Sequence, residues 1–222
     1  MKKLQIAKIQ FNKEIQGSEI KHFRGAVINK LNKDNILFHN HEGNKFRYKY
    51  PLIQYKRINK KASLICIDSG VNEVQELFAL KDWEIKIGEE KKSLAVENLN
   101  LNQFNMQVWN HYFDYNLFNW MALNQKNYEK YKYIKTENEK YLFLENILRG
   151  NILSMCKGIG LDVDKEIKVH LNDIANEKVI TYKDVKHQTF DVSFKTNIFL
   201  PEYIGLGKGV SIGFGTVKTR KE

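Results

Sequence analysis

The segment from Gly205 to Gly215 reads GLGKGVSIGFG, and five of its eleven residues are glycine. Glycine reaches backbone conformations that other residues avoid, and it lets another chain approach closely. A Walker-type phosphate loop needs Ser or Thr after its Gly-Lys pair, whereas Gly209 follows Lys208 here. A dinucleotide-binding fold continues from its glycines into a helix and a return strand, and the seven residues after Gly215 are too few for both. Both small-nucleotide interpretations are therefore excluded.

Two interpretations of this glycine-rich segment remain. In the first, its backbone N–H groups meet the phosphate oxygens of a nucleic acid, because no side chains stand in the way. In the second, it is a tight turn in which the glycines serve the packing of the chain itself. The candidate phosphate contacts are Gly205, Gly207, Lys208, Gly209, Gly213 and Gly215.

The positive charge of the chain is concentrated near its N-terminus. The formal net charge is +10, and residues 1–60 hold 14 Lys and Arg against 4 Asp and Glu. Residues 61–222 hold 22 residues of each sign and are neutral as a whole. Such asymmetry is typical of proteins that bind a polyanion, either a nucleic acid or a membrane surface. The alternative is a solvated basic surface that only aids solubility.

Sequence features that mark membrane or exported proteins are missing from this chain. No segment approaches the roughly 20 apolar residues that cross a bilayer, and residues 1–9 lack the apolar region of an export signal. Cys66 and Cys156 are far apart in the sequence, and each stands among apolar residues, so a disulfide framework is not expected. We expect a cytoplasmic protein with no membrane partner.

Hydrophobic periodicity predicts mixed helices and strands in the first half. Apolar residues recur at helical spacing at Ile20, Phe23, Val27 and Leu31, and a second short helix face covers 74–78. Strands are predicted at 4–11, 36–38, 62–68 and 83–87. The order strand, helix, strand, strand, helix, strand is that of the ferredoxin-like split βαβ unit.

The second half repeats this pattern less clearly. A long helix is predicted over 137–157, and 124–135 is expected to be an irregular insertion. Strands are predicted at 104–118 (one or a pair), 167–171, 179–185, 189–200 and 216–218. The predicted fold class is therefore α+β, with tandem ferredoxin-like halves over 1–95 and 96–222 and the glycine-rich segment near the C-terminus. Many unrelated proteins share this fold, so it does not settle function.

The glycine-rich segment, at the end of two ferredoxin-like halves, resembles a known family. That family is the CRISPR-associated repeat-processing endoribonucleases, the Cas-six family of the repeat-associated RNA-binding superfamily. Three stretches of the N-terminal half are similar to its subtype I-B branch: FRGAV (23–27), LFHNH (37–41) and YPLIQYK (50–56). The C-terminal match consists of the five glycines and Phe214. Residues 100–165 carry little of the resemblance.

His39 and His41 are the candidate acid–base residues. Histidine titrates near neutral pH and can both accept and return a proton. In an extended segment, residues two apart point to the same face, so both imidazoles can meet one scissile bond. Arg47, Lys49, Lys56 and Arg57 supply cations for phosphate, and the rings interleaved with them can stack on bases. An equally weighted alternative to base stacking is that the tyrosines of residues 46–57 pack against the sheet.

The resemblance implies cleavage of RNA by its own 2′-hydroxyl, without a metal or another cofactor, giving a 2′,3′-cyclic phosphate and a 5′-hydroxyl. It points to His41 and to Tyr48, seven residues on, as catalytic residues, with His39 as a second candidate. A catalytic lysine of other branches is not placed. The implied partner is CRISPR repeat RNA, with other CRISPR effector-complex subunits and a homodimer as further options.

Other interpretations of the same stretch remain open. A metal site at His39, His41 and Glu42 is short of a convincing ligand set, and both histidines can also be ordinary surface residues. At the level of function, the alternative is a non-catalytic RNA-binding subunit of a CRISPR effector complex. A third interpretation is a basic interaction module with no role in RNA.

Overall fold

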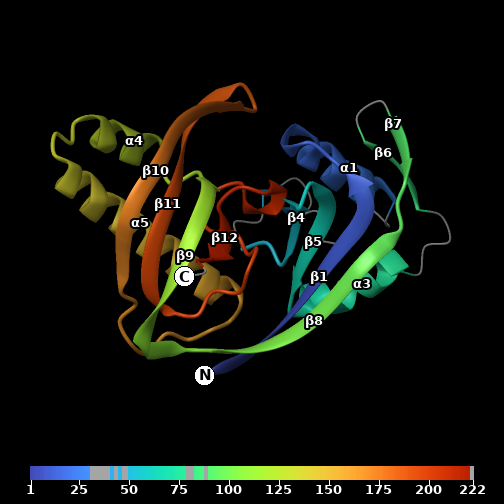
Figure 1. Ribbon diagram of the computed structural model, residues 1–222, viewed down its shortest axis with the longest axis horizontal. Coiled ribbons are helices and arrows are strands. Elements are labelled where there is room, and N and C mark those ends of the chain that lie inside the picture. The colour runs from blue at the N-terminus through green and yellow to red at the C-terminus, as the bar shows by residue number, and fades with distance from the viewer. Residues whose placement is uncertain (31–40, 43–44, 47–49, 79–82, 88–89, 221–222) are drawn as a thin grey trace. The chain divides into compact units, whose positions relative to one another are not determined.

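The computed structural model describes residues 1–30, 41–42, 45–46, 50–78, 83–87 and 90–220, with the side chains of 41–46 left undescribed (Figure 1). The chain divides into two compact units. One comprises Lys2–Asn105 with Ser211–Gly213, and the other comprises Met106–Val210 and Phe214–Glu222 with Met1. The division falls after Asn105 and not after residue 95, because the strand that contains residues 96–106 belongs to the first sheet.

The first unit is built on a four-stranded sheet. Its strands are β1 (Lys2–Glu14), β4 (Ile53–Ile58), β5 (Lys61–Ile67) and β8 (Val96–Met106), in the order β4-β5-β1-β8. Antiparallel pairing aligns Ile9 with Leu64 and Leu64 with Tyr55, and all three side chains are buried. Asn59 and Lys60 join β4 to β5 with positive φ at both positions, as a two-residue type I′ hairpin turn requires.

Two helices complete the first ferredoxin-like unit. A 3-10 turn, η1 (Gly17–Glu19), leads into α1 (Ile20–Lys30), and α3 (Ser69–Phe78) follows β5. Phe23 anchors α1, since its ring lies 5.8 Å from that of Phe11 and 5.6 Å from that of Tyr55, centroid to centroid. The two short hairpins β2/β3 (His41–Glu42, Lys45–Phe46) and β6/β7 (Glu84–Ile87, Glu90–Ser93) stand apart from the main sheet.

The second unit repeats the arrangement. Its sheet has the order β10-β11-β9-β12, from β9 (Val108–Trp120), β10 (Val169–Tyr182), β11 (Val185–Ile198) and β12 (Thr216–Thr219). The helices α4 (Gln125–Lys132) and α5 (Glu137–Gly158) lie beside β10 (Figure 1). In both sheets the second and third strands of the unit pair with each other, and the first strand lies between the third and the fourth. The tandem ferredoxin-like prediction is therefore confirmed.

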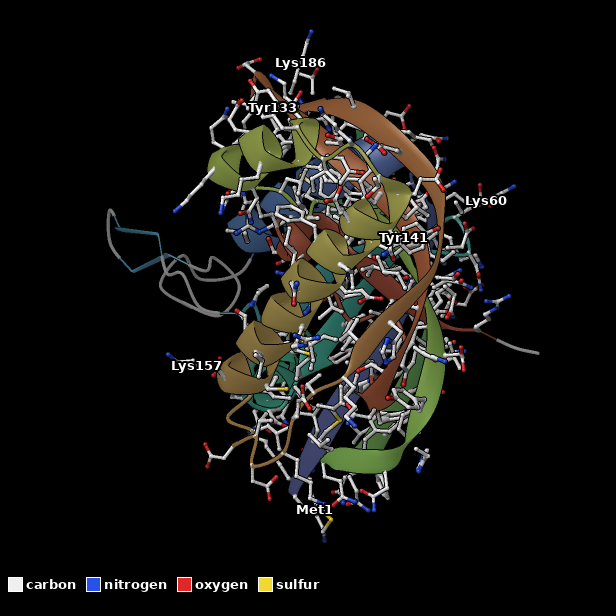
Figure 2. All side chains as sticks on the ribbon, turned by 90° about the vertical axis from the view of Figure 1, so that its left-hand side faces the viewer. Met1, Lys60, Tyr133, Tyr141, Lys157 and Lys186 are labelled. Carbon is white, nitrogen blue, oxygen red and sulfur yellow. The ribbon has the colours of Figure 1, made fainter. Side chains whose placement is uncertain are left out.

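Helix α5 is the main support of the second sheet. Thr136 caps its N-terminus, in a capping box with Glu139. Its buried face consists of Leu144, Leu148, Ile152, Met155 and Cys156. Figure 2 shows the helix running from Tyr141 toward Lys157. The predicted helix over 137–157 is confirmed to within one residue at its end.

Three predicted elements differ from the structure. The strand predicted at 83–87 exists as β6 (Glu84–Ile87), but the fourth strand of the first sheet is β8. The expected insertion at 124–135 contains the helix α4. Asn124 caps the N-terminus of this helix, and its side chain accepts a hydrogen bond from Asn127 N. The strands predicted at 167–171, 179–185 and 189–200 are two strands of a long hairpin, β10 and β11. The strand predicted at 36–38 lies outside the described residues.

Candidate functional site

The glycine-rich segment occupies the place of the second helix of the second unit. It connects β11 to β12 and contains only one short 3-10 helix, η2 (Val210–Ile212). Isolated bridges join Lys208 to Met121 and Gly205 to Thr216, so the first part of the segment is held beside the end of β9 and the start of β12. The segment is therefore an ordered part of the fold.

The glycines of this segment are required by the chain's own packing. Gly207, Gly209, Gly213 and Gly215 have φ values of 89°, 68°, 95° and 58°, in the left-handed region that favours glycine. A Cβ on Gly207 would lie 2.8 Å from the Trp120 ring, and one on Gly215 would overlap the carbonyl oxygen of Leu206. The chain's own packing thus explains why these four positions are glycine, without a ligand, in agreement with the tight-turn interpretation.

Some backbone amides of the segment are already engaged. The amide of Lys208 donates to Met121 O at 3.3 Å, and that of Gly215 donates to Asn119 O at 3.1 Å. In the part of the chain that the structure describes, the amides of Gly207 and Gly209 have no hydrogen-bond acceptor. These two amides are available to meet a phosphate, and phosphate contact at the segment stays a prediction.

Lys208 projects from the segment toward the start of α4. Its Nζ donates a hydrogen bond to the carbonyl oxygen of Leu123 at 3.2 Å. Partial burial lowers the pKa of Lys208, because desolvation penalises the charged form. The ammonium group is therefore positioned by the protein before any ligand arrives.

The predicted catalytic residues lie where the structure describes little. His41 belongs to β2, and its backbone pairs with Phe46 of β3, but no side-chain position is described for it. His39, Arg47, Tyr48 and Lys49 lie outside the described residues. Their roles in catalysis and RNA binding therefore stay predictions.

Lys56 and Arg57, expected as surface contacts for RNA, have different environments. Lys56 is 1% exposed and pairs across strands with Ser63, which is also buried. Its ammonium group is therefore directed into the interior and not at solvent, since alternation along β4 puts it on the same face as buried Gln54. Arg57 is exposed, and its Nε donates to Ile15 O at 2.6 Å. Of the two, Arg57 is the one that remains open to phosphate.

Burial lowers the pKa of Lys56 to about 7. A lysine whose pKa is lower in the folded protein than in the unfolded chain destabilises the fold most below its folded pKa, and this cost decreases as pH rises toward the unfolded pKa. We therefore expect the free energy of unfolding to rise as pH increases from about 7 toward 10. Lys56→Met should flatten that rise, because methionine has no group that titrates.

Denaturant unfolding at pH 7 and pH 9 measures this effect. Lys3→Met is the matched control, because it removes the same charge from an exposed position on β1. It should leave the pH dependence unchanged. Destabilisation by Lys56→Met at pH 7 with an unaltered pH dependence would show that Lys56 is charged in the folded protein.

Among the described residues, no three His, Cys, Asp or Glu side chains are close enough to hold a metal ion. None of the described helices is both long and apolar enough to span a membrane. Cys66 and Cys156 are buried free thiols, and burial raises the pKa of the Cys66 thiol to about 12.

Sequence reasoning missed a pocket in the second unit, next to the glycine-rich segment. Its volume is about 550 Å³, and it lies where Gly207 and Lys208 meet α4 and α5. Four of its lining residues are asparagines: Asn124, Asn127, Asn146 and Asn151. Their spacing along the chain has no recognised motif, so only the fold reveals that they converge.

Both units have the ferredoxin-like strand order, and in the second unit a glycine-rich segment stands in place of the last helix. Models of the Cas6b N-terminal and C-terminal domains match residues 2–105 and 107–220. The chain therefore belongs to the Cas6b family.

The chain is also similar to individual proteins. A crystal structure of Cas6b is 31% identical, with 99% of this chain and 100% of that chain covered and a TM-score of 0.88. A crystal structure of the CRISPR RNA processing endoribonuclease Cas6b is 28% identical, with the same coverage and a TM-score of 0.75. An uncharacterized protein of Methanocaldococcus jannaschii is 43% identical over 98 residues, which are 44% of this chain and 65% of that protein.

Proposed function

We propose that this protein is a metal-independent endoribonuclease that cuts CRISPR repeat RNA into guide RNAs. The observation that carries the proposal is the match of both units to Cas6b domains over nearly the whole chain. A relative of known structure with the same two-unit fold is named as a CRISPR RNA processing endoribonuclease. The excess of positive charge in residues 1–60 suits a polyanionic substrate.

The proposed reaction is an attack by RNA on its own backbone. A base removes the proton of the 2′-hydroxyl, and the oxygen attacks the adjacent phosphorus while the bond to the 5′-oxygen breaks. An acid protonates that leaving oxygen, which gives a 2′,3′-cyclic phosphate and a 5′-hydroxyl. We assign proton transfer to His41, with His39 as the second candidate. Tyr48 positions the phosphate, and nearby cations such as Arg57 stabilise the charged phosphorane.

Incubating the purified protein with RNA of the CRISPR repeat from its source genome tests the proposal. We expect one cut at a defined position in the repeat, and no cut in a shuffled RNA of the same composition. Tight binding without cleavage would favour the non-catalytic subunit of an effector complex. Failure to bind either RNA would leave a basic interaction module as the better account.

A further inference from the structure

The pocket beside the glycine-rich segment is built from three parts of the second unit. Asn124 begins α4, Asn146 and Asn151 come from α5, and Gly207 with Lys208 forms the third wall. Figure 2 shows the side of this unit on which α4 and α5 lie. All of these residues belong to the same compact unit, so the pocket does not depend on how the two units are placed.

Hydrogen bonds fix the orientation of three of the asparagine side chains. The indole N–H of Trp120 donates to Asn151 Oδ1 at 2.8 Å. The amide N–H of Asn127 donates to Asn124 Oδ1 at 2.7 Å, and the Arg149 guanidinium donates to Asn146 Oδ1 at 3.1 Å. Each of these partners can only donate, so each asparagine must use its oxygen there and keep its NH₂ group for another acceptor.

The remaining polar groups of the pocket are therefore mostly hydrogen-bond donors. Three amide NH₂ groups are joined by the Lys208 ammonium, and the Phe143 ring supplies an aromatic surface. A second pocket of about 540 Å³ shares Phe143 and Asn146 and adds Lys130, Lys135 and Glu139, whose carboxylate accepts a hydrogen bond from the Thr136 hydroxyl. A ligand that suits this surface has an aromatic ring, an edge made only of acceptors, and an attached anion.

Among the RNA bases, guanine fits this description best. Its Hoogsteen edge presents two adjacent acceptors, N7 and O6, whereas adenine and cytosine present an amino donor on the same edge. Uracil places an N–H between its two carbonyl oxygens. Unpaired bases of RNA are recognised in this way, stacked on an aromatic ring and hydrogen-bonded along one edge.

We propose that this pocket binds one unpaired guanine nucleotide of RNA. The guanine edge accepts hydrogen bonds from the asparagine NH₂ groups, its ring stacks on Phe143, and its phosphate lies near Lys208 or the lysines of the adjoining pocket. The assignment of the nucleotide to an RNA substrate rests on the proposed function. The binding of guanine itself does not.

Titration of the full chain with guanosine monophosphate, followed by NMR at the Trp120 indole N–H, tests the proposal. This signal reports on the pocket because the indole donates directly to Asn151. We expect a saturable shift, with affinity roughly tenfold or more above that for the adenosine, cytidine and uridine monophosphates. Removal of the N7 acceptor, in the 7-deaza analogue, should weaken binding to a similar extent.

Asn151→Asp is the decisive variant. It keeps an acceptor for Trp120 but replaces the NH₂ donor with a second oxygen, so guanosine monophosphate should bind at least about tenfold more weakly. Asn138→Asp makes the same charge change on an exposed residue of α5 outside the pocket, and it should bind as the wild type does. A retained Trp120 signal shows that Asn151→Asp is folded.

Three results would overturn the proposal: no shift with any nucleotide, equal shifts with all four, or the same shift with inorganic phosphate alone. Equal weakening by the two Asp variants would also overturn it, since the effect would then be charge alone. None of these readouts requires cleavage. Loss of the guanine site would therefore leave the endoribonuclease proposal standing, and absence of RNA cleavage would leave a guanine site intact.

Discussion

Replacing His41 by alanine should slow the cleavage of repeat RNA by about 100- to 10,000-fold, because a positioned acid or base typically contributes that much to the rate. Binding of the repeat should change little, since the imidazole acts on the transferred proton and the surrounding cations hold the phosphates. Single-turnover cleavage measures the first quantity, and filter binding at fixed salt concentration measures the second.

Two further histidine variants sharpen this experiment. His22→Ala is the matched control, because His22 is an exposed histidine on α1, and it should cut at the wild-type rate. His39→Ala separates the two candidates for proton transfer. Normal cleavage by His41→Ala together with loss in His39→Ala would move the catalytic role to His39. Normal cleavage by both variants would leave the basic stretch with binding alone.

Gly215→Ala should destabilise the protein by about 3 kcal/mol or more. The residue has φ of 58°, and an added Cβ would overlap the carbonyl oxygen of Leu206. That backbone is tied on both sides, since Leu206 N donates to Gly215 O at 2.8 Å and Gly215 N donates to Asn119 O at 3.1 Å. Neither strand end can move without breaking these bonds, so strain and lost hydrogen bonds add.

Thermal unfolding measures this effect, as a midpoint lower by about 10 °C for a chain of this size. Gly25→Ala is the matched control. Gly25 lies within α1, and an added Cβ meets nothing within 4 Å, so alanine there should stabilise the helix by about 0.5–1 kcal/mol. Equal midpoints for the two variants would contradict the view that the glycine-rich segment is held by its own packing.

Strongly periodic elements of this fold could be predicted from the sequence. The amphipathic repeat of α5, the mixed apolar and polar pattern of β1 and the apolar run of β5 are sufficient to place them. Helix α4, QKNYEKYK, could not be recognised, because Tyr131 is its one buried residue and the rest is polar. It is stabilised by its Asn124 cap and by its contacts in the tertiary structure, which a periodicity search does not weigh.

Strand β8 could not be predicted from the sequence, for a related reason. Its side chains are mostly exposed, including Leu99 at 53% and Leu101 at 62%, so it lacks a clear buried face. It joins the sheet through its backbone beside β1, and a local pattern contains no information about such a long-range pairing. The shorter 83–87 segment alternates more clearly, so the sequence pattern predicts it as the fourth strand.

The candidate site was predictable in part. The glycines at 207, 209, 213 and 215 stand out in the sequence, but only the structure shows that positive φ and close contacts account for them. Lys56 looks like its basic neighbours in the sequence, and only the register of β4 against β5 reveals that it is buried. The convergence of Asn124, Asn146 and Asn151 likewise depends on how α4 packs beside α5.

The central claim is that the protein cuts repeat RNA with the RNA's own 2′-hydroxyl as nucleophile and without a metal ion. Mass spectrometry of the cleavage products, made in the presence of excess EDTA, tests it most directly. The account predicts undiminished cleavage, with a 2′,3′-cyclic phosphate on the upstream product and a 5′-hydroxyl on the downstream one. Loss of cleavage in EDTA would contradict the absence of a metal ion, and a 5′-phosphate on the downstream product would contradict the 2′-hydroxyl as nucleophile, because that product requires attack by an external water.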